Sequence, residues 1–330
     1  MPKVLVLGGS GFIGNHVVRE LLKRHYDVRV LVRPSSDLKL FGDLPSVELF
    51  TGDLEDTDSL SKALEGVDSL IHTAAYYPVY SLDKTSQVSR AKKQIDTIHS
   101  ALKNSNCKKF VYVSTLTAVG HYPDGQPEDE NAPFPGNRYK STYASLKRAM
   151  QDEVLNRTED FNSIVVAPTA VFGPGDIKPT TGRVIVETAK NHFPFALAGR
   201  TNVVDVRLVA KGTVRALEKG KIGRLYVLGG ENMTAFEMIK RIAVVAGAFK
   251  PILALPILPL LPLAWLSELI GKRQGLQTPA IPVVGLDLSR FSDHYSSEVA
   301  KRELNYDPLE ISYEKSIEDS LNWFREMGYL

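Results

Sequence analysis

The stretch KVLVLGGSGFIGNHVVRELLKRH, from Lys3 to His25, determines how the rest of the sequence is interpreted. It begins with four apolar residues, Val4 to Leu7, a run typical of a short strand buried on both faces. Glycines follow, and then apolar residues recur at the spacing of a helix that buries one side. These residues are Ile13, Val17, Val18, Leu21 and Leu22. The stretch therefore predicts a strand, a glycine turn and an amphipathic helix.

Strands and helices continue to alternate as far as Thr169. The predicted strands are DVRVLV, VELFTGD, SLIHTAA, KFVYVST and SIVVAPT. The predicted helices lie at DTDSLSKALEG, from about Thr85 to Lys103, and around Tyr139 to Leu155. Such alternation implies right-handed crossovers and a parallel sheet covered on both faces. We predict an α/β protein with a Rossmann-type doubly wound parallel sheet.

Beyond VFGPGDIKPTTGR the alternation weakens. Strands are predicted at NVVDV and RLYVLGG, with a helix from about Thr234 and another at the C-terminal LNWFREMGYL. We expect residues 1–172, together with about 203–229, to form the Rossmann domain. About 173–202 and 230–330 are expected to form a smaller α+β substrate-binding domain that closes one side of a cleft.

Composition excludes several classes of protein. The 330 residues are 43% hydrophobic and 24% charged with a net charge of +2, which is ordinary globular material without a basic stripe for nucleic acid. The single cysteine, Cys107, rules out an internal disulfide and any cysteine-rich metal site, and we predict no metal. The N-terminus shows no export signal, so a cytoplasmic protein is expected.

The glycine turn predicts dinucleotide binding. Gly9, Gly11 and Gly14 fit the pattern G-x-G-x-x-G, and Gly8 with the last two fits G-x-x-G-x-x-G. In either case glycine lets backbone amides approach a pyrophosphate at the positive N-terminal end of the following helix. The alternative, a turn without a ligand, is less consistent with its place between a buried strand and an amphipathic helix.

The end of the second strand indicates which dinucleotide is bound. A site for NAD(H) places an acid here against the ribose hydroxyls, whereas this sequence has Arg33. A guanidinium suits the 2′-phosphate of NADP(H), so we predict NADP(H) over NAD(H), with Ser35, Ser36 or Lys39 as further donors. Arg33 as a solvated strand end is the alternative. Asp53, after the third strand, could bind the adenine amino group or cap a helix.

Two tyrosine–lysine pairs have the spacing that a ketone reductase needs. Tyr80 and Lys84 follow the fourth strand in a proline-containing stretch without helical periodicity, which predicts a loop. Tyr143 and Lys147 instead lie on a predicted helix, where residues four apart share a face. That helix follows a buried strand ending in Ser114 and Thr115, at the sheet edge where ligands of parallel sheets bind. We therefore expect the second pair to be catalytic.

The predicted chemistry gives each of these groups a role. When a hydride is added to a carbonyl carbon, the oxygen needs a proton from an acid, and a free tyrosine has a pKa near 10. A neighbouring ammonium, here Lys147, is expected to lower the pKa of Tyr143 and also to bond the nicotinamide ribose. Thr115, or Ser114 beside it, would hold the substrate oxygen within reach of Tyr143.

The motifs GGSGFIG, GDLED, IHTAA, VYVST, YASLK and VAPTAVFGPGD follow one another along nearly the whole chain. In this order they resemble the extended short-chain dehydrogenase/reductases of the NAD-dependent epimerase/dehydratase superfamily. VRP and GPGDIKPTTGR resemble its dihydroflavonol 4-reductase-like group, which includes sequences labelled hopanoid-associated sugar epimerases. The resemblance implies a catalytic set of Thr115, in place of the more usual serine, Tyr143 and Lys147. The predicted cofactor site comprises Gly8, Gly11, Phe12, Ile13, Gly14, Arg33, Asp53, Leu54, Ala74, Tyr143, Lys147 and Pro168.

The sequence departs from the family pattern in two places, and the second of these guides the substrate prediction. Ala91 and Gln94 stand where related sequences usually carry Asn and Gly, and the glutamine and arginine of sugar-nucleotide members are missing near AGRTNVVDV. With Ser114, Tyr76, Tyr77 and Tyr80 as substrate contacts, we predict an apolar or aromatic ketone, aldehyde or alcohol. The alternatives are a nucleotide-sugar epimerase or dehydratase that retains its cofactor, and a non-catalytic NADP(H) sensor. Either a monomer or a homodimer is compatible with the sequence.

The segment PILALPILPLLPLAWL, Pro251 to Leu266, has an unusual composition. It is shorter than the roughly 20 apolar residues of a membrane span and contains four prolines. We predict a helix and loop that cover a lipophilic substrate pocket or pack as core. Contact with a membrane surface is the alternative.

Overall fold

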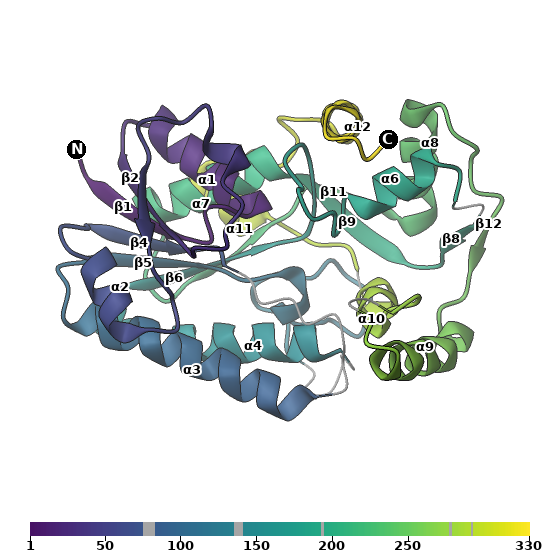
Figure 1. Ribbon diagram of the computed structural model, residues 1–330. Coiled ribbons are helices and arrows are strands. Elements are labelled where there is room, and N and C mark those ends of the chain that lie inside the picture. Colours follow the sequence, from purple (N-terminus) through teal and green to yellow (C-terminus); the bar gives the residue numbers. More distant parts are fainter. Residues whose placement is uncertain (75–82, 135–140, 193–194, 277–278, 292) are drawn as a thin grey trace.

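The protein is described from a computed structural model over residues 1–74, 83–134, 141–192, 195–276, 279–291 and 293–330. Within these residues seven parallel strands form the central sheet in the order β10-β6-β5-β4-β1-β2-β3 (Figure 1). The strands are β1 (Lys3–Leu7), β2 (Asp27–Val32), β3 (Glu48–Thr51), β4 (Ser69–His72), β5 (Lys109–Val113), β6 (Ser163–Pro168) and β10 (Leu225–Leu228). The doubly wound parallel sheet predicted from the sequence is confirmed.

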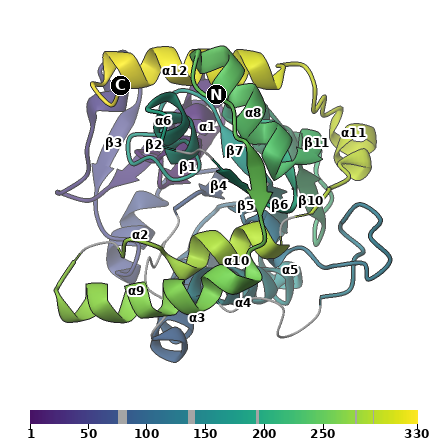
Figure 2. The ribbon, with the colours of Figure 1, turned by 90° about the vertical axis from the view of Figure 1, so that its right-hand side faces the viewer.

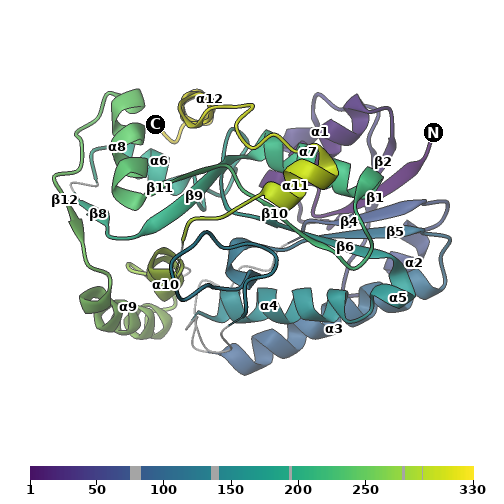
Figure 3. The ribbon, with the colours of Figure 1, turned by 180° about the vertical axis from the view of Figure 1, so that it is seen from behind.

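Helices cover both faces of this sheet. One face carries α1 (Phe12–Lys23), α7 (Val206–Lys219) and α11 (Glu298–Leu304), which Figure 3 shows side by side. The other carries α2 (Thr57–Ala63), α3 (Lys84–Lys103), α4 (Thr142–Leu155) and the short α5 (Thr158–Phe161). In β1 the side chains of Val4 and Val6 join the first core, and those of Leu5 and Leu7 join the second. This division explains why the first strand is apolar at every position from Val4 to Leu7.

The order of the strands reverses between β1 and β4. The chain passes from β1 to β2 and β3 on one side, then crosses to β4, β5 and β6 on the other. In open parallel sheets ligands bind at such a switch point, outside the carboxyl ends of the strands. The glycine turn after β1 and the residues after β4 and β5 all lie at this edge.

The remaining strands form two smaller sheets. β9 (Arg200–Asp205) pairs in parallel with β7 (Ala170–Phe172) and antiparallel with β11 (Glu231–Thr234), while β8 (Phe195–Leu197) pairs with β12 (Leu253–Leu255). A third core lies between these strands and the helices around them. The helices of this part are α6 (Arg183–Ala189), α8 (Ala235–Ala246), α9 (Leu261–Arg273), α10 (Val283–Phe291) and α12 (Tyr313–Glu326), and short 3-10 turns lie at Lys39–Phe41, Leu116–Ala118 and Leu258–Leu260.

The apolar segment Pro251 to Leu266 forms β12, the third 3-10 turn and the first half of α9. Most of its large side chains are exposed, with Ile257 an exception. The expectation that this segment packs as core is therefore wrong for most of it, because α9 contacts the protein through small or polar residues, Ala264, Glu268 and Gly271. Among the described residues, no helix combines the length and the hydropathy required to cross a membrane.

Candidate active site

The glycine turn is shaped by the close approach of three backbone segments. Gly8 has a φ of +83°, and a Cβ placed on it would lie 2.5 Å from the backbone nitrogen of Ala74. A Cβ on Gly14 would lie 2.1 Å from the carbonyl oxygen of Gly8. Side chains are thus excluded at both positions, and α1 packs directly against the end of β1.

Gly11 serves a different purpose from these two glycines. A Cβ at this position would meet only the Gly8 oxygen, at 3.3 Å, so the outer side of the turn is open. Gly11 is the N-cap of α1, no side chain caps this helix within the described chain, and its first turn contains no acid. The amides that begin the helix, at Phe12, Ile13 and Gly14, are therefore available to a ligand, and the turn fits the pyrophosphate of a dinucleotide.

Arg33 and Asp53 follow β2 and β3 at the same sheet edge. Arg33 is exposed in a turn closed by a bond from the Ser36 amide to its carbonyl, 2.9 Å, and the guanidinium has no ion-pair partner among the described residues. Asp53 accepts the Glu55 amide at 3.0 Å. The cap of α2 is Asp56, which accepts the Asp58 amide. The alternative role of Asp53 as the cap of this helix is therefore wrong.

Three other predicted cofactor residues lie near the strand ends. Ala74 follows β4, and its amide donates to Leu7 of β1 at 3.0 Å, which brings it against Gly8. Leu54 is half-buried after β3, and Pro168 is buried as the last residue of β6. Their contribution to cofactor binding remains a prediction.

The helix α4 brings Tyr143 and Lys147 to the end of β5. Its N-cap is Ser141, whose hydroxyl accepts the Ala144 amide, and the tyrosine and lysine follow on one face of the first turns. The Tyr143 phenol is hydrogen-bonded to the Thr115 side chain, just beyond β5. Lys147 is 2% exposed and donates from Nζ to the Val113 carbonyl at 3.0 Å. The predicted catalytic triplet therefore does come together in space.

Burial shifts the pKa values of this pair in ways that the sequence did not predict. It raises the pKa of Tyr143 above its ordinary value, an effect that the hydrogen bond from Thr115 opposes. Burial also lowers the pKa of Lys147 to about 7. The expected lowering of the tyrosine pKa by Lys147 is not seen, because both groups are desolvated and the ammonium is directed to the Val113 carbonyl.

Two aromatic residues that the sequence analysis missed lie beneath Lys147. The Nζ atom lies 4.7 Å from the centre of the Tyr112 ring, which is within the range of a cation–π contact. The Tyr112 ring in turn lies 5.4 Å from that of His72, a fully buried residue whose pKa is lowered to about 3 by burial and by Lys147. His72 is thus neutral at physiological pH. The sequence does contain a signal for His72, because the motif IHTAA places a histidine directly after the apolar residues of the predicted fourth strand.

Ser114 is positioned differently from its neighbour. Its buried hydroxyl donates to Oε1 of Gln151 on α4 at 2.6 Å, so its proton is committed to the protein. Thr115, rather than Ser114, therefore contacts Tyr143. The predicted substrate contacts Tyr76, Tyr77 and Tyr80 lie outside the described residues, and Lys84, the partner expected for Tyr80, begins α3.

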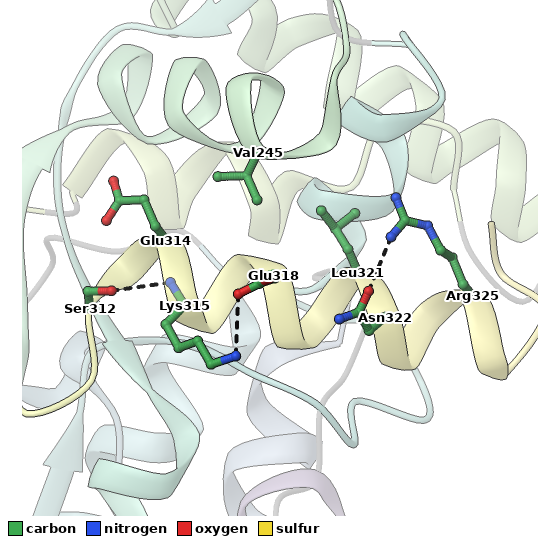
Figure 4. A pocket seen from close by; sticks show the side chains of 8 residues that line it. All are labelled: Val245, Ser312, Glu314, Lys315, Glu318, Leu321, Asn322 and Arg325. Atoms are coloured by element: carbon green, nitrogen blue, oxygen red, sulfur yellow. Dashed lines mark hydrogen bonds and ion pairs between the residues drawn. The ribbon is translucent and has the colours of Figure 1, made fainter.

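Two other features of the surface are separate from this site. A depression between α8 and α12 is lined by eight residues, including Val245, Glu314 and Lys315 (Figure 4), and it lies on the side of the molecule away from α4 (Figure 1). Its charged groups pair with protein groups, as in the 3.3 Å contact of Lys315 with Glu318. Its lining contains neither a tyrosine nor a glycine.

His121, Glu128 and Asp293 form the second feature, since each has a ligand atom within 4.8 Å of the others. Glu128 accepts from the His121 ring, and Asp293 is ion-paired with Arg200 at 2.8 Å. The three side chains thus bond to other groups of the protein, and we interpret the cluster as a structural polar network.

Comparison with known proteins agrees with this geometry. The sequence model of the NAD dependent epimerase/dehydratase family matches residues 4–229. The chain belongs to this family. It is accordingly a nicotinamide-dependent enzyme of the oxidoreductase type found among the extended short-chain dehydrogenase/reductases, and the resemblance deduced from its motifs is confirmed.

Relatives similar over almost their whole length bear reductase or sterol names. A Synechocystis sp. protein provisionally named a dihydroflavonol 4-reductase is 30% identical, with 98% of this chain and 95% of the relative covered. The "Sterol demethylase protein B" of Methylococcus capsulatus is 29% identical, with 99% of each covered. The mouse "Sterol-4-alpha-carboxylate 3-dehydrogenase, decarboxylating" is 26% identical, with 98% of this chain and 91% of the relative covered.

A solved structure carries the name of a different activity on the same fold. It is described as a nucleoside-diphosphate-sugar epimerase from Pseudomonas aeruginosa, is 25% identical and superposes with a TM-score of 0.83. The match covers 100% of this chain and 99% of the other. Reductases and epimerases therefore both occur among the proteins that this chain resembles.

Proposed function

We propose that the protein interconverts a ketone or aldehyde and an alcohol on an apolar or aromatic small molecule, with NADP(H) as cofactor. The observation that carries the proposal is the hydrogen bond between Thr115 and Tyr143, one helical turn from the buried ammonium of Lys147. An acid held beside a second hydroxyl suits proton transfer to a carbonyl oxygen.

The residues of this chain divide the work of such a reaction. Bound NADP(H) would supply or accept the hydride. With substrate bound, Thr115 would donate its proton to the substrate oxygen instead of to Tyr143 and hold that oxygen beside the phenol. The phenol then gives its proton to the substrate oxygen during reduction or takes a proton from it during oxidation. The open glycine turn holds the pyrophosphate, and Arg33 binds the 2′-phosphate.

Lys147 has two states available near neutral pH, because its pKa is about 7. In the charged state, once a bound cofactor has drawn the ammonium away from the Val113 carbonyl, it would donate to a ribose hydroxyl and favour a phenolate at Tyr143. The Tyr112 ring and the Val113 carbonyl favour this charged state from below, whereas burial opposes it. Whether the Lys147 amine is protonated near neutral pH therefore depends on which cofactor or substrate groups lie beside it.

An apolar substrate is supported by two observations. The named relatives include two sterol enzymes, and sterols are largely hydrocarbon. A nucleoside diphosphate would need cationic donors, but Arg200, the arginine of the stretch AGRTNVVDV, already pairs with Asp293 through Nε at 2.8 Å and donates to the Gly125 carbonyl at 3.0 Å. Its guanidinium is thereby committed to the protein.

The second candidate is a nucleotide-sugar epimerase or dehydratase, which the Pseudomonas aeruginosa structure favours. In that case the hydride returns to the same substrate. The deciding experiment incubates the purified protein with NADPH and panels of ketones, aldehydes and sugar nucleotides, and follows both NADPH absorbance and product formation. Net oxidation of NADPH with an apolar ketone supports the first proposal. Conversion of a sugar nucleotide at constant NADPH absorbance supports the second and overturns the first.

A further inference from the structure

The helix α9 presents its apolar side to solvent. The residues that it turns toward the protein, Ala264, Glu268 and Gly271, are small or polar and recur at helical spacing. On the outer side Leu263 and Leu266 are each 53% exposed. Trp265, Leu269 and Ile270 are also exposed. This arrangement is the reverse of an ordinary surface helix, which buries its apolar stripe.

The exposed apolar residues of the described chain are concentrated around this helix. Leu258 lies in the 3-10 turn before α9, Leu276 follows the helix, and the Ile281 amide donates to Ser267 of α9 at 2.9 Å; the side chains of all three are exposed. We call the surface formed by these residues and the outer side of α9 the apolar face. Figure 2 shows α9 along the lower edge of the molecule, with α10 beside it. Exposed apolar side chains gathered along one helix in this way mark an interaction site rather than scattered exposure.

The charges bordering the apolar face have a single sign. Lys272 and Arg273, in the last turn of α9, are exposed, and neither has an ion-pair partner in the described part of the chain. The only acid between Phe249 and Ile281 is Glu268, which is fully buried and accepts the Val283 amide at 3.0 Å. An apolar surface with a basic border complements an anionic lipid surface.

The same charges disfavour a second copy of this chain as the occupant. A two-fold contact through the apolar face would apply the same patch to itself, so basic side chains would border basic side chains. Lipid headgroups supply the negative charge that the face itself lacks. We propose that the protein docks peripherally on anionic phospholipid membranes through the apolar face.

The place of α9 links this surface to the active site. Ala264 of α9 packs against Val283 and Leu286 of α10, and Asp287 of α10 accepts the Ser141 amide at the start of α4. One intervening helix therefore separates the apolar face from the helix that carries Tyr143. If the proposed function holds, an apolar substrate dissolved in the bilayer lies on the same side of the molecule as the site.

The test uses the fact that the chain has two tryptophans, Trp265 and Trp323. In a Trp323→Phe protein the fluorescence reports Trp265 alone. We expect vesicles of phosphatidylcholine and phosphatidylserine in equal amounts to shift this emission to the blue and to carry the protein upward in a flotation gradient. Vesicles of phosphatidylcholine alone should bind it at least about tenfold more weakly, since they lack the negative charge that attracts basic residues to a membrane surface.

Matched variants separate the apolar face from general surface hydrophobicity. The double variant Leu266→Ser with Ile270→Ser should weaken vesicle binding at least about tenfold. The control is Ile222→Ser with Leu309→Ser, which removes two aliphatic side chains that are 53% and 62% exposed elsewhere on the surface. The control should change vesicle binding less than about twofold. Lys272→Gln with Arg273→Gln should reduce the preference for phosphatidylserine. Circular dichroism melts confirm that each variant is folded.

Three results would overturn the proposal. One is the absence of flotation with the anionic vesicles, and another is an equal loss of binding in the control pair. The third is a dimer in light scattering that Leu266→Ser with Ile270→Ser dissociates, because a second copy would then cover the apolar face. None of these measurements depends on turnover, so this proposal and the proposed function can fail separately.

Discussion

Asp287 of α10 accepts the backbone N–H of Ser141 at 2.6 Å, and both residues are fully buried. Ser141 is the residue that caps α4, two positions before Tyr143. A carboxylate from a C-terminal helix, 146 residues away along the chain, thus fixes the start of the helix that bears the proposed acid. Asp287 is a positioning residue, because it acts on the site only through the backbone of α4.

Asp287→Ala should lower kcat by about tenfold or more and reduce the free energy of unfolding by about 1–3 kcal/mol, since a buried amide loses its acceptor. NADPH affinity should change less than kcat, because the glycine turn that would hold the pyrophosphate lies between β1 and α1 and not on α4. Asp287→Asn keeps an acceptor oxygen and should lose less activity than the alanine variant. Steady-state kinetics, urea unfolding and NADPH titration measure the three quantities. An unchanged kcat in Asp287→Ala would show that α4 needs no such support.

Tyr143→Phe should lower kcat by about 10²- to 10⁴-fold, because the variant lacks the phenol that is hydrogen-bonded to Thr115. NADPH should still bind, which fluorescence titration can verify in the same sample. Tyr122→Phe is the matched control, since that hydroxyl bonds Asp129 at 2.8 Å outside the site and its removal should leave kcat within about twofold of wild type. Wild-type turnover in Tyr143→Phe would remove the phenol from the mechanism.

Arg33→Ala should raise the Kd for NADPH roughly tenfold and leave that for NADH almost unchanged, because only NADPH has the 2′-phosphate. Arg33→Lys, which keeps the charge but loses the planar fork, should fall between the alanine variant and wild type. Isothermal titration with each nucleotide gives the comparison. Tighter binding of NADH than of NADPH by the wild-type protein would refute the phosphate role of Arg33.

Lys147→Met should stabilise the cofactor-free protein, and more so at pH 6 than at pH 9. In the folded chain the Lys147 pKa is about 7, against about 10.5 when unfolded. Below pH 7 both states hold the proton and the full cost of burying the ammonium is present. Between pH 7 and 10.5 the unfolded state alone holds it, so wild-type stability rises with pH.

The advantage of the methionine variant should therefore shrink by about 2–3 kcal/mol between pH 6 and pH 9, at about 1.4 kcal/mol per pKa unit. Denaturant unfolding of wild type and Lys147→Met at pH 6 and pH 9 gives the difference in their free energies of unfolding at each pH. Lys147→Arg, which stays charged throughout, should show no such convergence with the methionine variant. A pH-independent difference between wild type and Lys147→Met would mean that Lys147 is hydrated in the folded protein.

The central sheet and the catalytic helix could be predicted because their signals are local. Each of these signals spans only a few consecutive residues: the apolar run Val4 to Leu7, the glycines that follow it, and the pair Tyr143 and Lys147. A parallel sheet covered on both faces then follows from the right-handed crossover rule. The pairing of the phenol with Thr115 rather than Ser114 was inferred from the family pattern, and the geometry agrees with that choice.

What escaped prediction depends on contacts between distant segments. The desolvation that shifts the pKa values of Tyr143 and Lys147 exists only once β4, β5 and α4 pack together. Asp287 cannot be assigned to Ser141 from spacing, and the outward orientation of α9 requires knowing where α10 lies. The sequence shows that the first half of α9 is apolar, but composition does not show which side of a helix faces solvent.

The strand order also has a consequence for how the chain is made. β10 pairs with β6 at one edge of the central sheet, but it leaves the ribosome only after β7, β8, β9 and α7 have been synthesised. Until then the outer edge of β6 has no partner strand, and its amides and carbonyls are open to mispairing with other nascent chains. Chaperone capture of nascent chains halted just before Leu225 should therefore exceed that of chains released beyond Leu228.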